Sequence, residues 1–115
     1  MRRIEKYNVA VIGDENLAVG FRLAGVKKVY EIPKNADERR LAREYLKEIL
    51  EDPKIGIIIV HEKFSKHVED IVLEYKGKNI PIVVYVPGIE GPAHPDVKEY
   101  YKQYVKKVIG FAVEF

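Results

Sequence analysis

Residues 55–60 read IGIIIV and form the most hydrophobic run of the chain. Five of these six residues are β-branched, and no polar residue interrupts them. A continuous apolar run of this length, rich in β-branched side chains, is typical of a strand that is buried on both of its faces. The run therefore predicts a central strand of a parallel sheet, with helices packed on either side.

Three further apolar runs, at 7–12, 26–32 and 80–86, predict the other strands. The segments between the four runs place apolar residues at helical spacing, which predicts one amphipathic helix in each. These residues are Leu17, Phe21 and Ala24, then Leu41, Tyr45 and Ile49, then Phe64, Val68 and Ile71. Strands and helices are thus expected to alternate along the chain.

Alternation with connections of about a dozen residues predicts right-handed crossovers and an α/β fold. We expect a four-stranded parallel sheet in the order 2-1-3-4 with flanking helices, as in receiver-like and Rossmann-like domains. Asp14 is expected to cap the first helix and Gly25 to end it. The strand at 26–32 carries lysines and is expected at an edge.

Beyond the fourth strand the pattern changes. We expect an α/β core domain over 1–86, a linker over 87–95 that contains three prolines and two glycines, and a C-terminal interaction helix with its tail over 96–115. The helix carries an apolar stripe at helical spacing, formed by Val97, Tyr101, Tyr104, Val105, Val108 and Ile109. Six such side chains left in water would forfeit on the order of 10 kcal/mol, as much as the whole stability of a small domain. The helix must therefore dock, either on its own sheet or on another protein.

Composition excludes several classes of function. A net charge of +2 over 115 residues is too small to indicate nucleic-acid binding. The chain contains no cysteine, so it has no disulfide framework and no thiolate chemistry. No apolar run approaches the roughly 20 residues that cross a bilayer, and residues 1–9 lack the apolar core of a signal peptide.

The carboxyl ends of the first and third strands are where such a sheet would bind a ligand. Residues 13–20 read GDENLAVG, without the second glycine of a dinucleotide fingerprint, so an oxidoreductase is disfavoured. His61 and Glu62 follow the third strand, where a phosphorylated receiver would carry an aspartate. A metal or acid/base cluster of Asp14, His61 and Glu62 is conceivable. Helix capping by Asp14 and Glu62 is the favoured interpretation, so we expect no catalytic residue, metal or cofactor.

Several stretches resemble the F subunits of the archaeal A-type and vacuolar V-type rotary ATPases. Residues 11–15 (VIGDE) and 19–26 (VGFRLAGV) are similar to the opening of that family, although the threonine often found before the GF pair is missing. Residues 55–68 (IGIIIVHEKFSKHV) resemble its third strand and helix, and residues 106–110 (KKVIG) resemble its basic and apolar ending.

The resemblance implies a non-catalytic central-stalk subunit that couples ATP synthesis or hydrolysis to proton or sodium transport through protein contacts. The implied partners are the coiled-coil shaft and the catalytic head, with one copy of the chain in a hetero-oligomer at the cytoplasmic face of the membrane. The residues expected to bind partners are Phe21, Arg22, Leu23, Val97, Tyr101, Tyr104, Val105, Val108, Ile109 and Phe111. The alternative is a degenerate receiver-like or small-ligand-binding regulatory domain that uses Asp14, Glu15, His61 and Glu62.

Overall fold

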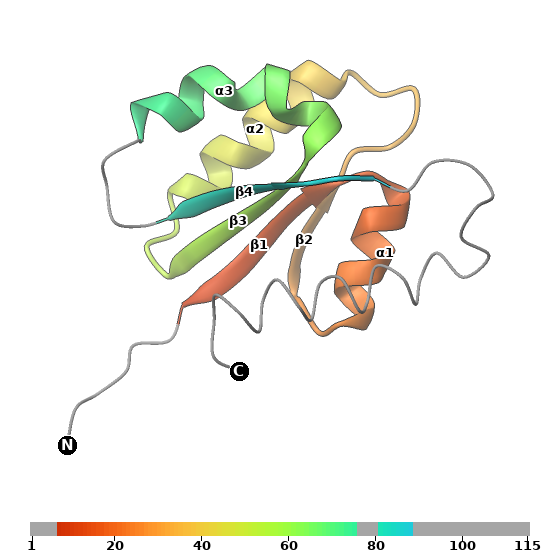
Figure 1. Ribbon diagram of the computed structural model, residues 1–115, viewed down its shortest axis with the longest axis horizontal. Coiled ribbons are helices and arrows are strands. Elements are labelled where there is room, and N and C mark those ends of the chain that lie inside the picture. Colours follow the sequence, from red (N-terminus) through yellow and green to blue (C-terminus); the bar gives the residue numbers. More distant parts are fainter. Residues whose placement is uncertain (1–6, 76–80, 89–115) are drawn as a thin grey trace.

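The computed structural model of this chain describes residues 7–75 and 81–88 (Figure 1). The elements in chain order are β1 (Asn8–Gly13), α1 (Glu15–Leu23), β2 (Lys28–Glu31), α2 (Glu38–Leu50), β3 (Ile55–His61), the 3-10 turn η1 (Glu62–Phe64), α3 (Ser65–Glu74) and β4 (Ile82–Val86). The predicted C-terminal helix and tail, and the linker after Gly88, lie outside the described residues.

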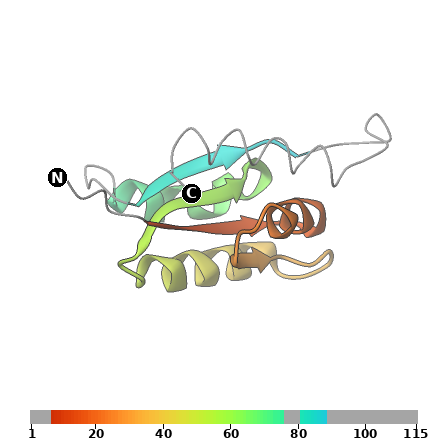
Figure 2. The ribbon, with the colours of Figure 1, turned by 90° about the horizontal axis from the view of Figure 1, so that it is seen from below.

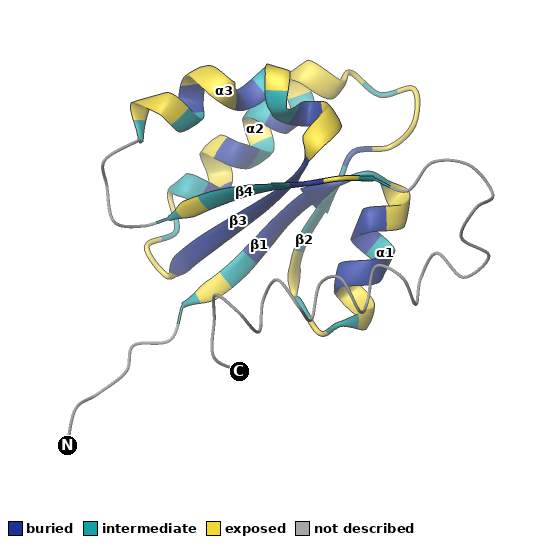
Figure 3. Cartoon of the chain, viewed as in Figure 1, coloured by how far each residue is buried: buried dark blue, intermediate teal, exposed yellow. Residues whose placement is uncertain are grey.

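All four strands are parallel and run in the order β2-β1-β3-β4, which confirms the predicted topology. Every residue of β3 is buried, as its sequence predicts, and Figure 3 shows this strand buried along its whole length. The strand with lysines, β2, lies at one edge. The carboxyl ends of β1 and β3 therefore meet side by side in the middle of the sheet.

Helices α2 and α3 cover one face of the sheet, and α1 lies on the other face (Figure 1). Figure 2 shows α1 next to β1 and β2, with β4 at the opposite edge of the sheet. On the α1 face, Leu17 and Phe21 pack with Val11, Ile57 and Ile59. The β4 end of this face is less well covered among the described residues, since the Ile82 side chain there is 54% exposed.

The end of α1 explains why β2 begins later than its apolar run. Gly25 has a φ of +99°, which favours glycine, and its N–H donates to the carbonyl of Arg22. The N–H of Val26 donates to the carbonyl of Phe21 over 3.0 Å, which completes a Schellman motif. Val26 and Lys27 are therefore used to leave the helix, and β2 begins only at Lys28.

Helices α2 and α3 are joined by a bidentate ion pair. The guanidinium of Arg43 donates to both carboxylate oxygens of Asp70, at 2.7 and 3.0 Å, and also to the carbonyl of His67. The hydrogen bonds from Arg43 hold the pKa of the Asp70 carboxyl below its usual value. The paired geometry fixes the two helices that together cover the larger face of the sheet.

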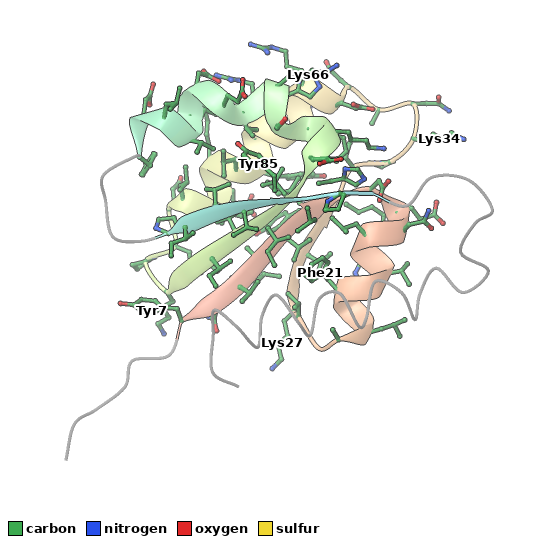
Figure 4. All side chains as sticks on the ribbon, viewed as in Figure 1. Tyr7, Phe21, Lys27, Lys34, Lys66 and Tyr85 are labelled. Atoms are coloured by element: carbon green, nitrogen blue, oxygen red, sulfur yellow. The ribbon has the colours of Figure 1, made fainter. Side chains whose placement is uncertain are left out.

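Replacement of tyrosine by phenylalanine is expected to have opposite effects on stability at two positions, 85 and 30. Tyr85 points to the α2 and α3 side of the sheet (Figure 4), and its hydroxyl oxygen is buried with no hydrogen-bond partner among the described residues. The Tyr30 hydroxyl donates to Glu48 over 2.8 Å. We expect Tyr85→Phe to raise the free energy of unfolding by about 1 kcal/mol, because it removes an unsatisfied buried group. Tyr30→Phe is expected to lower it by about 0.5–1 kcal/mol.

Urea unfolding followed by circular dichroism measures both effects, and the two variants serve as controls for each other. Equal losses of stability in the two variants would contradict the assignment of Tyr85 as the unsatisfied hydroxyl. Burial, reinforced by the hydrogen bond to Glu48, raises the pKa of Tyr30 to about 12. The neutral phenol that donates to Glu48 is therefore the form present at neutral pH.

Candidate functional site

The site expected at the carboxyl ends of β1 and β3 is a cluster of three polar side chains. Asp14 follows β1, His61 is the last residue of β3, and Lys63 lies in η1. The Asp14 Oδ2 atom lies 3.5 Å from His61 Nε2 and 3.3 Å from Lys63 Nζ. The other oxygen, Oδ1, accepts the backbone N–H of Leu17 over 3.0 Å and so caps α1, as predicted. Both oxygens of this carboxylate are therefore engaged by the chain itself.

His61 is buried, with an exposed fraction of 5%, and it caps the turn that follows β3. Its Nδ1 atom accepts the backbone N–H of Lys63 over 3.1 Å. An accepting Nδ1 carries no proton, so the neutral ring has its proton on Nε2, on the side of Asp14. The predicted cap by Glu62 is wrong, because Glu62 is an exposed residue inside the turn and His61 takes the capping position.

The small-ligand alternative has an open pocket at the carboxyl end of β3, lined by His61, Glu62, Lys63, Ser65 and Gly88, but only part of its residue set meets there. Of its four residues, the structure brings Asp14 and His61 together but leaves Glu15 and Glu62 exposed. Within residues 7–75 and 81–88, no group of three or more histidine, aspartate or glutamate side chains is placed to hold a metal ion. Lys63 was not predicted as part of this cluster, although its place three residues after the predicted strand at 55–60 was visible in the sequence.

Gly88, which follows β4, lies directly against the His61 ring. A Cβ atom added to Gly88 would stand 2.3 Å from His61 Nε2 and 2.7 Å from Cε1. Any side chain at this position would therefore collide with the imidazole. Glycine in a linker is an ordinary feature of sequence, so nothing in the chain signalled this contact. The contact between Gly88 and His61 places the start of the predicted linker at 87–95 against the polar cluster.

The predicted partner-binding residues of α1 have different surroundings. Phe21 is fully buried and points into the sheet (Figure 4), so it offers no surface to a partner and we assign it to the core. Leu23 is 52% exposed, as expected from its place on the other side of the helix. Arg22 is half exposed, and its guanidinium lies 3.3 Å from the Glu31 carboxylate. The other predicted contact residues, from Val97 to Phe111, lie outside the described residues.

Removal of the Asp14 carboxylate is expected to destabilise the fold more than removal of an ordinary cap. Asp14→Ala loses the cap of α1 together with the contacts to His61 and Lys63, and we expect a loss of about 2 kcal/mol. Asp37→Ala is the matched control, because Asp37 caps α2 through a single exposed hydrogen bond of 3.2 Å. A loss of about 0.5–1 kcal/mol is expected there. Urea titration compares the two variants, and equal losses would mean that the cluster adds nothing to the cap.

Known proteins are similar to this chain over most of its length. The profile of the family described as "ATP synthase (F/14-kDa) subunit" matches residues 9–105. The F subunit of the A-type ATP synthase of Pyrococcus abyssi is 31% identical over 106 residues, which cover 92% of this chain and 97% of that protein. The corresponding protein of Thermococcus onnurineus is 33% identical over 102 residues, covering 89% of this chain and 93% of that protein.

A solved structure supports the fold. The crystal structure of the V-type ATP synthase F subunit of Archaeoglobus fulgidus superposes with a TM-score of 0.60 at 24% identity, covering 71% of this chain and 99% of that chain. In the part of the chain that the structure describes, no helix is long and apolar enough to span a membrane. The match of the family profile over most of the chain agrees with the similarity to nearly complete F subunits. This chain belongs to the family of the ATP synthase (F/14-kDa) subunit, which includes the F subunits of A-type and V-type ATP synthases.

Proposed function

We propose that this chain is a non-catalytic central-stalk subunit of an A-type/V-type ATP synthase. It couples ATP synthesis or hydrolysis to proton or sodium transport through protein contacts alone. The observation that carries this proposal is the family match over residues 9–105, which extends through the core and most of the predicted C-terminal stripe. Asp14, His61 and Lys63 contact one another, and their groups take part in helix capping and ion pairing. These contacts support a role without catalysis.

The proposed partners are the coiled-coil shaft and the catalytic head of the same complex. One copy of the chain binds them at the cytoplasmic face of the membrane, without entering the bilayer. The contact surface has two parts, the end of α1 and the apolar stripe of the C-terminal helix. At the end of α1, exposed Leu23 stands beside Arg22, and a half-exposed leucine next to an arginine suits a protein interface. The second part consists of Val97, Tyr101, Tyr104, Val105, Val108, Ile109 and Phe111.

We propose that the predicted C-terminal helix, in residues 96–115, can dock on the chain's own sheet as well as on the shaft. The β4 end of the α1 face presents Ile82, half exposed, and Val84, partly buried. A helix over residues 96–109 would extend about 21 Å, and the five residues of β4 extend about 17 Å, so the predicted stripe and the strand would have similar lengths. The proposed linker at 87–95 allows this helix to exchange between its own sheet and the shaft. The same apolar stripe is used in both positions.

Isolation of the chain with its complex tests the proposal. We expect an affinity-tagged chain, expressed in its source organism, to copurify from detergent-extracted membranes with a coiled-coil subunit and the nucleotide-binding head subunits. The purified chain alone is expected to bind that coiled-coil subunit with a dissociation constant below the micromolar range and to hydrolyse no ATP. ATP hydrolysis by the isolated chain, or failure to bind the shaft, would refute the proposal.

A further inference from the structure

The outward side of α1 carries an apolar side chain that neither core cluster uses. Leu17 and Phe21 of this helix are buried and pack on the sheet. Val19 lies midway between them in the sequence, and two residues of a helix turn the chain by about 200°, so Val19 faces away from the sheet. It is partly buried, but within residues 7–75 and 81–88 it is not among the side chains that pack on either core cluster. The two core clusters therefore give no reason for a valine at this position.

Val19 belongs to a row of side chains along the helix. Residues four apart lie on the same side of a helix, so Glu15, Val19 and Leu23 form one row, about 12 Å long, which we call the outward row. Glu15 is exposed and Leu23 is 52% exposed, so the row has a polar end and an apolar end. Rows of this spacing fit into the grooves between the rows of a second helix, whereas a strand presents its side chains with a period of two. The outward row is therefore shaped for a helical partner.

The ends of α1 hold the outward row in a fixed direction. The Asp14 carboxylate accepts the N–H of Leu17 over 3.0 Å at the first turn, and the Phe21 carbonyl accepts the N–H of Val26 over 3.0 Å at the last. Between these ends, the buried side chains of Leu17 and Phe21 fix the helix to the sheet. A surface that is already ordered loses little conformational freedom on binding, which favours its use as a contact.

The charges around the outward row define the chemistry of the partner. Arg22 lies beside Leu23, and its half-exposed guanidinium is 3.3 Å from the Glu31 carboxylate. Lys27 follows the helix, is exposed and forms no ion pair with another described residue. The Leu23 end of the row is therefore basic, and Glu15 makes the other end acidic. A complementary helix carries aliphatic residues three or four apart, with an acidic residue near the basic end and a basic residue near Glu15. Among the proposed partners, a coiled-coil shaft offers helices that continue over many turns.

We propose that the outward row of α1 packs lengthwise against one helix of the coiled-coil shaft, with Val19 at the centre of the contact. The two helix axes cross at about 20° or about 50°, the angles at which rows and grooves interlock. Val19, which was not predicted as a contact residue, then contributes more to binding than Arg22 at the side of the row. This inference rests on the proposed function, which supplies the shaft as the partner.

Cross-linking of introduced cysteines measures the direction of the contact. The chain has no cysteine, so Val19→Cys and Leu23→Cys each give one reactive position in the full chain. Each variant is oxidised together with single-cysteine variants of the purified coiled-coil subunit, stepped one residue at a time along its outer side. Val19 and Leu23 are about 6 Å apart along the axis of α1, so their preferred partners on the shaft should lie about three or four residues apart. The same preferred partner for both variants, or no cross-link in a complex that forms, overturns the proposal.

Thiol labelling of Val19→Cys identifies what covers the outward row. The thiol should react at least about tenfold more slowly in the complex than in the free chain, because the centre of an interface is shielded from water. Equally slow labelling in the free chain would show that the chain itself covers the row. Protection that grows with the concentration of the chain alone would assign the row to a second copy. Either of these two results overturns the proposal.

Charged variants separate this inference from the proposed function. Val19→Lys is expected to weaken affinity for the shaft at least about thirtyfold, because it places a charge at the centre of an apolar contact. The introduced lysine stands one turn after Glu15 on the helix surface, so the midpoint of the urea transition should not fall. Leu73→Lys, at an exposed position of α3 on the opposite face of the sheet, is the matched control and should leave affinity unchanged.

Isothermal titration with the purified coiled-coil subunit measures these affinities. Equal binding by Val19→Lys and the parent chain refutes the contact through the outward row and leaves the proposed function standing. Failure of the parent chain to bind the shaft refutes both.

Discussion

A chain that ends at Gly88 is expected to remain folded and to lose its binding to the shaft. The truncation keeps β1 to β4 and the helices between them, including both core clusters. It removes all seven side chains of the C-terminal part of the proposed contact surface, from Val97 to Phe111. Two buried hot-spot residues of about 2 kcal/mol each would already weaken binding by roughly 1,000-fold, so we expect affinity to fall by at least a factor of 100.

Isothermal titration with the purified coiled-coil subunit measures the loss. The matched control is Lys102→Ala in the full chain, which shortens a side chain outside the stripe and should change affinity by less than threefold. Far-UV circular dichroism and a cooperative urea transition establish that the shortened chain is folded. Undiminished binding by the shortened chain would remove the C-terminal helix from the interface and leave α1 as the contact.

The same truncation also tests whether the C-terminal helix covers the sheet in the free protein. If the helix docks on its own sheet, as proposed, its removal exposes more of the face around Ile82 and Val84. We expect a modest loss of stability and increased binding of an apolar dye, because a continuous apolar patch becomes accessible. These readouts separate the role of the helix as a cover from its role as a contact.

The parts of the fold that follow from local patterns were predictable. The run at 55–60 predicted β3, and the alternation of apolar runs with amphipathic segments predicted the parallel order. Asp14 and Gly25 were identifiable as helix cap and helix end, because those positions require a short acceptor side chain and a positive φ. In each case a few neighbouring residues determine the outcome.

The parts that depend on distant residues were not predictable. The contact between Lys63 and Asp14 joins residues 49 positions apart, and the one between Gly88 and His61 depends on how β4 ends beside β3. Capping by His61 was missed because histidine is an uncommon cap, and the acidic Glu62 next to it is of the type that is favourable at the start of a helix. The division of α1 into a buried and an exposed side was predictable from spacing, but which of Phe21 and Leu23 faces the sheet was not.

The buried side of α1 gives the second large expected effect, a loss of stability. Phe21→Ala is expected to lower the free energy of unfolding by about 3–5 kcal/mol, because it leaves a cavity where a fully buried ring packs among Leu17, Ile57 and Ile59. A small domain has about 5–15 kcal/mol in total, so this variant should be largely unfolded in mild urea. Leu23→Ala, which trims a half-exposed side chain, should change stability by no more than about 0.5 kcal/mol.

Leu23→Ala, in contrast, is expected to affect binding to the shaft and not the stability of the fold. We expect Leu23→Ala to weaken affinity about tenfold with the fold intact, since a leucine at an interface contributes by its own burial. Leu73→Ala is the matched control, because Leu73 is also an exposed leucine, at 62%, but lies on α3 on the opposite face of the sheet. It should alter neither stability nor affinity. Equal effects of the two leucine substitutions on binding would show that the end of α1 is not a contact surface, because exposure of leucine alone would then account for both.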